Sequence, residues 1–175
     1  MKRLILPFLL ASSIFANEAN LEITNHSIEI NTKISIPQNE NFSFRGSYLY
    51  NDKTNKNNYF SAGIQAQGEN ALDSYNSKFA IFIDFDYTKN NSALPIGISL
   101  FNDNFGNTNY PLFAKIELAY APSVLSFDNA DKFYKIKTEI GVKPIENAKL
   151  FIGYKQTNFN TNYQAVGYIG VGFIF

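Results

Sequence analysis

The chain has 175 residues, with 15 basic and 15 acidic side chains and a formal net charge of zero, which argues against nucleic acid as a partner. It has no cysteine, so disulfides, thiolate nucleophiles and zinc–thiolate sites are excluded. Its 17 Phe and 11 Tyr, without any Trp, would have to form any aromatic girdle at a membrane interface.

The first 16 residues have the three parts of a secretory signal peptide. Lys2 and Arg3 are basic, residues 4–10 are apolar, and Ala16 is a small residue suited to cleavage, with Ala19 as the fallback. The apolar run is well below the ~20 residues that a membrane-spanning helix needs. We therefore expect residues 1–16 to be removed and residues 17–175 to form a single barrel domain.

After residue 16, apolar and aromatic side chains recur at every second position, which is the period of a β-strand. Clusters of Asn, Asp, Gly and Pro, which favour turns, separate these alternating runs. The pattern predicts nine strands, over residues 28–36, 42–50, 60–66, 79–87, 94–100, 112–120, 134–142, 150–154 and 165–175.

A tenth strand is predicted from the side of the membrane on which each turn and loop should lie. Single-chain bacterial barrels have even strand counts, short periplasmic turns and longer outer loops. If residue 175 is periplasmic, the turns at 144–147 and 37–41 are periplasmic and the loops at 121–132 and 157–164 are outside. The strand at 28–36 then starts outside and needs a strand before it, for which residues 21–24 are the candidate.

The predicted fold is therefore an all-β, antiparallel, up-and-down transmembrane β-barrel of ten strands, or of eight if weak runs merge or stay outside the membrane. A soluble β-sandwich has the same alternation of side chains. The signal peptide, the aromatic strand faces and the aromatic C-terminal strand favour the barrel.

The last strand is predicted to close the barrel. Its residues 169, 171, 173 and 175 share one face, which we expect to contact lipid, and the alternate positions 168, 170 and 172 form the inner wall. The outward face is also the predicted assembly signal for the outer-membrane assembly machinery, and it consists of Ile169, Val171, Phe173 and Phe175.

Several short segments resemble the YfaZ family of small outer-membrane proteins, over roughly residues 45–175. The most specific is 118–127 (LAYAPSVLSF), and the others are 93–97, 130–131, 146–148, 152–155 and 167–170. The resemblance implies a small barrel in the outer membrane of a Gram-negative bacterium. It implies no chemistry, because the family has no established activity.

If the apolar faces contact lipid, the charged positions between them point into the lumen. A narrow lumen excludes most water, so these charges are expected to pair. Pairs are expected between two adjacent strands, one with Lys115 and Glu117 and the other with Lys135, Lys137 and Glu139. The predicted luminal charge network consists of Glu29, Lys33, Arg45, Asp84, Asp86, Lys115, Glu117, Lys135, Lys137, Glu139, Lys149 and Lys155.

Few residues suggest catalysis or metal binding. His26 is the only histidine, and its place in a turn favours an exposed residue over a general base. Asp128 and Asp131 lack the glycine and oxygen spacing of a calcium loop, so a capped turn near Ser123 or Asp128 is favoured. No catalytic residue, metal or cofactor is predicted.

The sequence favours a non-enzymatic, monomeric outer-membrane barrel with a largely filled, charge-paired lumen and a structural or surface-interaction role. Its expected partners are outer-membrane lipid and the assembly machinery. The alternative is a narrow channel for ions or small solutes, suggested by the surplus of inward lysines. A lipid-modifying enzyme is the third hypothesis.

Overall fold

The computed structural model describes residues 17–37, 39–52, 58–72, 77–103, 111–159 and 163–175. The predicted signal peptide, residues 1–16, lies outside the described residues. No helix in the described ranges is long and apolar enough to cross a membrane.

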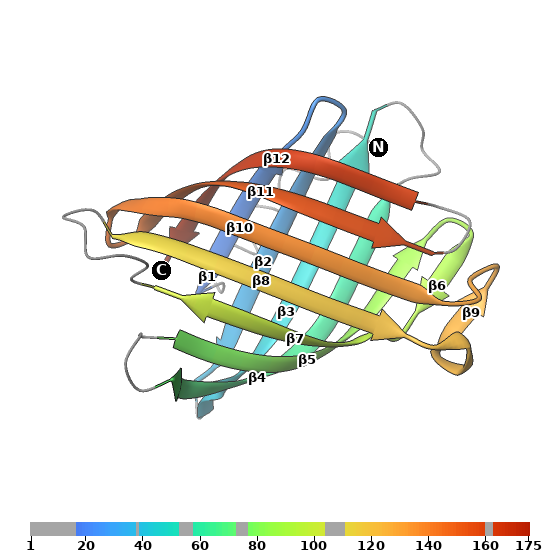
Figure 1. Ribbon diagram of the computed structural model, residues 1–175, viewed down its shortest axis with the longest axis horizontal. Coiled ribbons are helices and arrows are strands. Elements are labelled where there is room, and N and C mark those ends of the chain that lie inside the picture. The colour runs from blue at the N-terminus through green and yellow to red at the C-terminus, as the bar shows by residue number, and fades with distance from the viewer. Residues whose placement is uncertain (1–16, 38, 53–57, 73–76, 104–110, 160–162) are drawn as a thin grey trace.

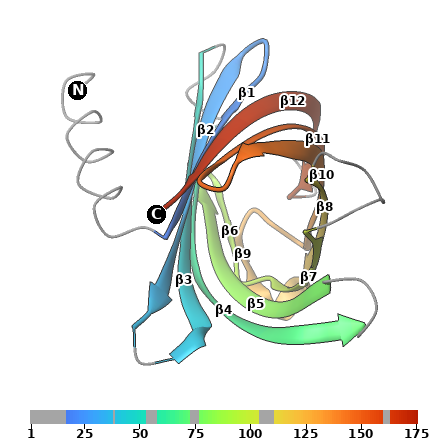
Figure 2. The same ribbon diagram turned by 90° about the vertical axis from the view of Figure 1, so that its left-hand side faces the viewer.

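Ten long strands form a closed antiparallel barrel in which each strand pairs with its neighbours in sequence and the last pairs with the first (Figure 1). Figure 2 shows the sheet curving back on itself. The barrel strands are β1 (Glu18–Ile23), β2 (Ser27–Ile36), β3 (Asn39–Asn51), β4 (Tyr59–Leu72), β5 (Ser77–Thr88), β7 (Ile96–Asn102), β8 (Leu112–Ala121), β10 (Phe133–Ile145), β11 (Ala148–Asn158) and β12 (Tyr163–Ile174).

The predicted ten-stranded, up-and-down barrel is confirmed, and the eight-stranded alternative is wrong. The weak run at residues 21–24 overlaps β1, which begins earlier, at Glu18, and ends at Ile23. This strand closes the sheet by pairing with β12 on one side and β2 on the other, with Glu18 opposite both Ile174 and Lys33.

The barrel has two distinct ends, which we call the terminal end and the loop end. At the terminal end the Phe175 amide donates a hydrogen bond to the Asn17 carbonyl over 3.0 Å, so both ends of the barrel domain meet there. The connections β2–β3 and β10–β11 also lie at the terminal end. The loop end carries the β8–β10 connection, which matches the predicted arrangement of turns.

Side chains alternate between the outer face and the lumen, as the sequence predicts. On β5, Ile81 and Ile83 are 51% and 44% exposed on the outer face. The alternate residues Phe82 and Asp84 are each 1% exposed and lie inside. Large apolar side chains are exposed in this way on many strands, as expected for the outer surface of a barrel in lipid.

Two connections differ from the sequence prediction. The strand predicted at 94–100 begins later, as β7 at Ile96, because Pro95 has no amide hydrogen for the ladder. A short strand β6 (Asn91–Ala93) that was not predicted lies before it, and Leu94 and Pro95 separate the two. The connection after β8 contains a 3₁₀ turn (Ser123–Leu125), near which a capped turn was expected, but no side chain caps it. A short strand β9 (Ser126–Asp128) follows. β6 pairs with the loop-end part of β5 and with β9.

The predicted turn at residues 144–147 is shorter than expected. β10 continues through Pro144 to Ile145, with a register shift against β11 between Val142 and Ile145. A bulge of this kind accommodates proline near the end of a strand, because the ladder there needs no hydrogen bond from the proline nitrogen.

The last strand has the two faces that its sequence predicts. Ile169, Phe173 and Phe175 are 63%, 51% and 65% exposed, and Val171 is partly exposed between them. Tyr168, by contrast, is buried and packs edge-on against Phe151, with the ring centroids 6.3 Å apart.

Gly170 makes this inner packing possible. A Cβ atom at Gly170 would overlap the Phe151 ring, and it would come within 3.0 Å of the Leu21 carbonyl oxygen. The glycine is therefore required by the close approach of an aromatic ring.

Candidate functional site

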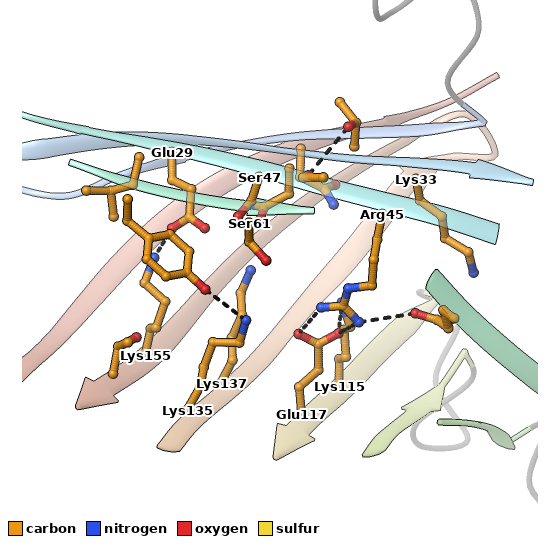
Figure 3. A pocket seen from close by; sticks show the side chains of 18 of the residues that line it. Glu29, Lys33, Arg45, Ser47, Ser61, Lys115, Glu117, Lys135, Lys137 and Lys155 are labelled. Carbon is orange, nitrogen blue, oxygen red and sulfur yellow. Dashed lines mark hydrogen bonds and ion pairs between the residues drawn. The ribbon is translucent and has the colours of Figure 1, made fainter. Parts of the chain in front are cut away.

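The lumen is the candidate functional site, because the charged side chains of the chain gather in it. All twelve residues of the predicted luminal charge network lie on inward-facing positions of β2, β3, β5, β8, β10 and β11. Figure 3 shows some of these side chains reaching towards one another from two walls, with Glu29, Lys33 and Arg45 on one and Lys115, Lys135 and Lys155 on the other.

Arg45 on β3 joins opposite walls of the barrel. Its Nη1 atom is 3.3 Å from Glu117 Oε1 on β8, and its Nη2 atom is 3.4 Å from Glu117 Oε2. Its Nε atom is 3.2 Å from Asp84 Oδ1 on β5, and the guanidinium lies 3.9 Å from the centre of the Phe82 ring. Three strands separate β3 from β8 in the ring, so this side chain crosses the lumen.

Lys135 on β10 is the centre of a second contact group. Its Nζ atom lies 3.4 Å from Asp84 Oδ2 and 3.5 Å from Asp86 Oδ2, both on β5. It also donates a hydrogen bond to the Tyr59 hydroxyl over 3.1 Å. The two aspartates that alternate along β5 are therefore held by one buried lysine, as expected for ionised groups away from water.

Three further lysines pair across the lumen with carboxylates on β1 and β2. Lys137 pairs with Glu22 as well as with Glu139 on its own strand, the latter over 3.2 Å. The other two pairs are Lys149 with Glu18 and Lys155 with Glu29.

Sequence reasoning missed Glu18 and Glu22. The prediction began the first strand at residue 21, whereas the alternation already starts at Glu18, with residues 18, 20 and 22 inward. Glu22 lies inside the predicted run 21–24 but was not assigned to the network, and extending the two-residue period back to residue 18 would have added Glu18.

The predicted pairs between the adjacent strands β8 and β10 do not form, although the strands are in the expected register. Lys115 lies opposite Glu139, and Glu117 opposite Lys137. Instead, Lys115 pairs with Glu117 on its own strand over 3.1 Å, and Lys137 reaches across to β1. The lumen is narrow enough that long side chains find partners on non-neighbouring strands.

An apolar cluster fills the lumen at the loop end. Its rings pack closely, with Phe159 4.5 Å from Phe133 and 6.4 Å from Tyr59 between ring centroids. Phe133 and Phe159 are 0% and 2% exposed. The loop-end cluster consists of Leu49, Tyr59, Ala93, Ala121, Ala130, Phe133 and Phe159.

Cavities between luminal side chains include two that are lined by the described charged residues. The first, about 90 Å³, lies beside the loop-end cluster and the charge network, and it is lined by residues such as Tyr59, Arg45 and Lys137. The second, about 220 Å³, lies towards the terminal end. Because a water molecule takes ~30 Å³ in the liquid, the first cavity has room for a few water molecules and the second for more. The two cavities share Glu18, Lys33, Gln65 and Lys115 in their walls.

The other residues considered in the sequence lie outside the lumen. His26 is in the β1–β2 turn, 3.8 Å from Asp52 Oδ1, and both side chains are exposed. Asp128 accepts a hydrogen bond from the Ser92 hydroxyl over 2.7 Å, which fixes β9 to β6. The described residues contain no group of three histidines, cysteines or carboxylates that could hold a metal ion.

Comparison with known proteins adds information on the fold. No family model and no curated protein matches the chain, so the YfaZ resemblance stays a prediction. One similar solved structure is the KdgM porin in complex with disordered oligogalacturonate, with a TM-score of 0.51 and 8% identity over 90% of this chain and 98% of that chain. A second, titled KdgM porin, has a TM-score of 0.46 with the same identity and coverage. The first match shows that this barrel has the fold of a porin.

Proposed function

We propose that this chain is an outer-membrane β-barrel without enzymatic activity, whose lumen is closed by its own side chains and whose role is structural or in surface interactions. Ion pairs across the lumen are the observation that carries the proposal. Arg45–Glu117, Lys135–Asp84 and Lys137–Glu22 each join strands that are not neighbours in the ring.

A pore for solutes needs a continuous water-filled path, and three features oppose one here. The bridging pairs occupy the middle of the lumen, the loop-end cluster fills one end, and the cavities are small. Wide aqueous channels are a property of barrels with ~16 strands or more, and this one has ten.

The outer-membrane location is supported by the outer face and by the fold. Large apolar side chains are exposed around the barrel, and residues 1–16 have the features of a secretory signal. The porin fold of the KdgM structure and the YfaZ resemblance point in the same direction. We infer that lipid and the assembly machinery are the partners of the outer face.

The second candidate function is a narrow channel for small anions. It is favoured by the walls that the two cavities share, because a small movement of Lys33 or Lys115 there would connect them. Lys33 and Lys115 outnumber Glu18 on those walls, so this part of the path would favour anions.

Conductance in planar lipid bilayers distinguishes the two. The closed barrel predicts that the folded protein, once inserted, gives no steady current above that of the protein-free bilayer. A large, steady single-channel conductance would contradict the closed lumen. An anion-selective current that falls in Lys135→Glu and Lys137→Glu, but not in the exposed control Lys132→Glu, would establish the channel instead.

A further inference from the structure

The cavity at the terminal end, which we call the terminal chamber, is strongly cationic. Its volume is about 220 Å³, and the described residues in its walls include five lysines and two carboxylates, a surplus of three positive charges among them. The charged residues lining it are Lys33, Lys78, Lys115, Lys143 and Lys149, with Glu18 and Asp103.

The surplus is confined to this chamber. The luminal charges that do not line it comprise four cations and six carboxylates, so the rest of the lumen has the opposite sign. These residues are Arg45, Lys135, Lys137 and Lys155 with Glu22, Glu29, Asp84, Asp86, Glu117 and Glu139.

Two of the chamber lysines form no ion pair with a described carboxylate, although Glu18 lies opposite Lys33 in the β1–β2 ladder. Lys143 pairs with Asp103, Lys149 with Glu18, and Lys115 with Glu117. Lys33, in contrast, donates to the neutral Gln67 Oε1 over 2.8 Å. Among the described residues, neither Lys33 nor Lys78 has an ion-pair partner, although both line the same cavity.

Two ammonium groups in a partly enclosed cavity, next to three other lysines, repel one another unless an anion lies between them. The chamber also offers a neutral donor, the buried Ser99 hydroxyl, and space for an ion with some water. Lysine is a common ligand of phosphate, which it binds as a point charge.

We propose that the terminal chamber binds a phosphate group, as the free ion or as a small monoester, with Lys33 and Lys78 as its principal ligands. The chamber lies at one end, so binding needs no passage through the barrel. The proposal therefore goes beyond the closed-barrel function, and either can fail without the other. If the terminal end faces the periplasm, the ligand comes from that side.

Calorimetric titration of the folded barrel in a phosphate-free, non-ionic detergent tests the site. Inorganic phosphate and glycerol 3-phosphate are titrated separately, at constant ionic strength set with chloride. We expect saturable binding of at least one of them to the unmodified chain, and binding about tenfold weaker or less in Lys33→Gln/Lys78→Gln. A preference between the two ligands identifies the free ion or the ester as the source.

The matched control is Lys89→Gln/Lys132→Gln, which removes two exposed lysines outside the lumen and should leave the affinity unchanged. Thermal unfolding gives a second measurement, because a ligand that binds only the folded barrel raises its unfolding temperature. The single variant Lys78→Gln should reduce that rise without lowering the stability of the ligand-free barrel. Absence of saturable binding, or equal binding by the unmodified chain and the Lys33→Gln/Lys78→Gln variant, would overturn the proposal.

Discussion

Arg45 shows how a single residue organises the lumen. Its planar guanidinium contacts Glu117 through two nitrogen atoms, Asp84 through a third, and the face of Phe82. Lysine has neither the fork nor the flat surface for these contacts together. The residue is therefore suited to hold three strands at fixed distances across the barrel.

Replacing Arg45 by methionine should destabilise the barrel by about 3 kcal/mol, because Glu117 and Asp84 would keep their charges in a buried place with fewer partners. Urea unfolding of the barrel in lipid vesicles measures the change. A loss of unfolding free energy below about 1 kcal/mol would mean that water solvates the Arg45–Glu117 pair, as it does an ion pair at a surface.

The matched control is Asp52→Asn, which removes the exposed partner of His26 at the loop end. Exposed pairs contribute about 0.5 kcal/mol or less, so this variant should unfold like the unmodified chain. The contrast between the two variants separates the effect of burial from that of charge alone.

At the residue scale, the sequence predicts which side chains point inward but not which of them pair. The two-residue period places Lys115, Glu117 and Lys137 on the luminal face, and they are there. Their partners depend on the ring order and the width of the barrel, which no local pattern contains. Hence the expected pairs between β8 and β10 were wrong, and the bond between Lys137 and Glu22 was not foreseen.

At the scale of the element, β12 and β1 close the barrel. β12 pairs with both β1 and β11, and the Phe175 amide donates to the Asn17 carbonyl just beyond the ladder. The outward apolar face of β12 was predicted from its alternation alone. The beginning of β1 was not, because Glu18 and Glu22 dilute its apolar signal.

Deleting Phe175 should impair assembly of the barrel, since it removes both that amide and the terminal residue of the predicted assembly signal. The measurement is the amount of folded, heat-modifiable protein in outer-membrane fractions. Ile145→Ala is the control, because Ile145 is as exposed as Phe175, at 65%, and lies at the same end. Normal levels of folded protein after the deletion would count against the signal.

Strand boundaries near prolines are the ones that the sequence pattern predicts least accurately. Pro95 lies just before β7, which therefore begins later than the strand predicted at 94–100, whereas Pro144 lies inside β10, where a turn was expected. A proline removes one ladder donor in both places, and the pairing around it decides whether the strand stops or bulges. That pairing is a property of the whole sheet.

At the scale of the whole molecule, the lumen has three zones along its axis. The loop-end cluster is apolar, the middle is crossed by ion pairs, and the terminal chamber is cationic. Arg45–Glu117 joins β3 to β8 and Lys137–Glu22 joins β10 to β1, so ion pairs link strands that are not neighbours in the ring. This arrangement supports the proposed closed lumen.

The closed lumen is the central claim, and thiol labelling tests it most directly because the chain contains no cysteine. Gln67→Cys places a thiol in the wall of the terminal chamber, and Val124→Cys, at a position 76% exposed, marks the loop end. Both variants are treated with a membrane-impermeant maleimide, in intact cells and after permeabilisation of the outer membrane. The closed lumen predicts that the two thiols are labelled from opposite sides of the membrane, and labelling of both from the side of Val124→Cys would contradict it.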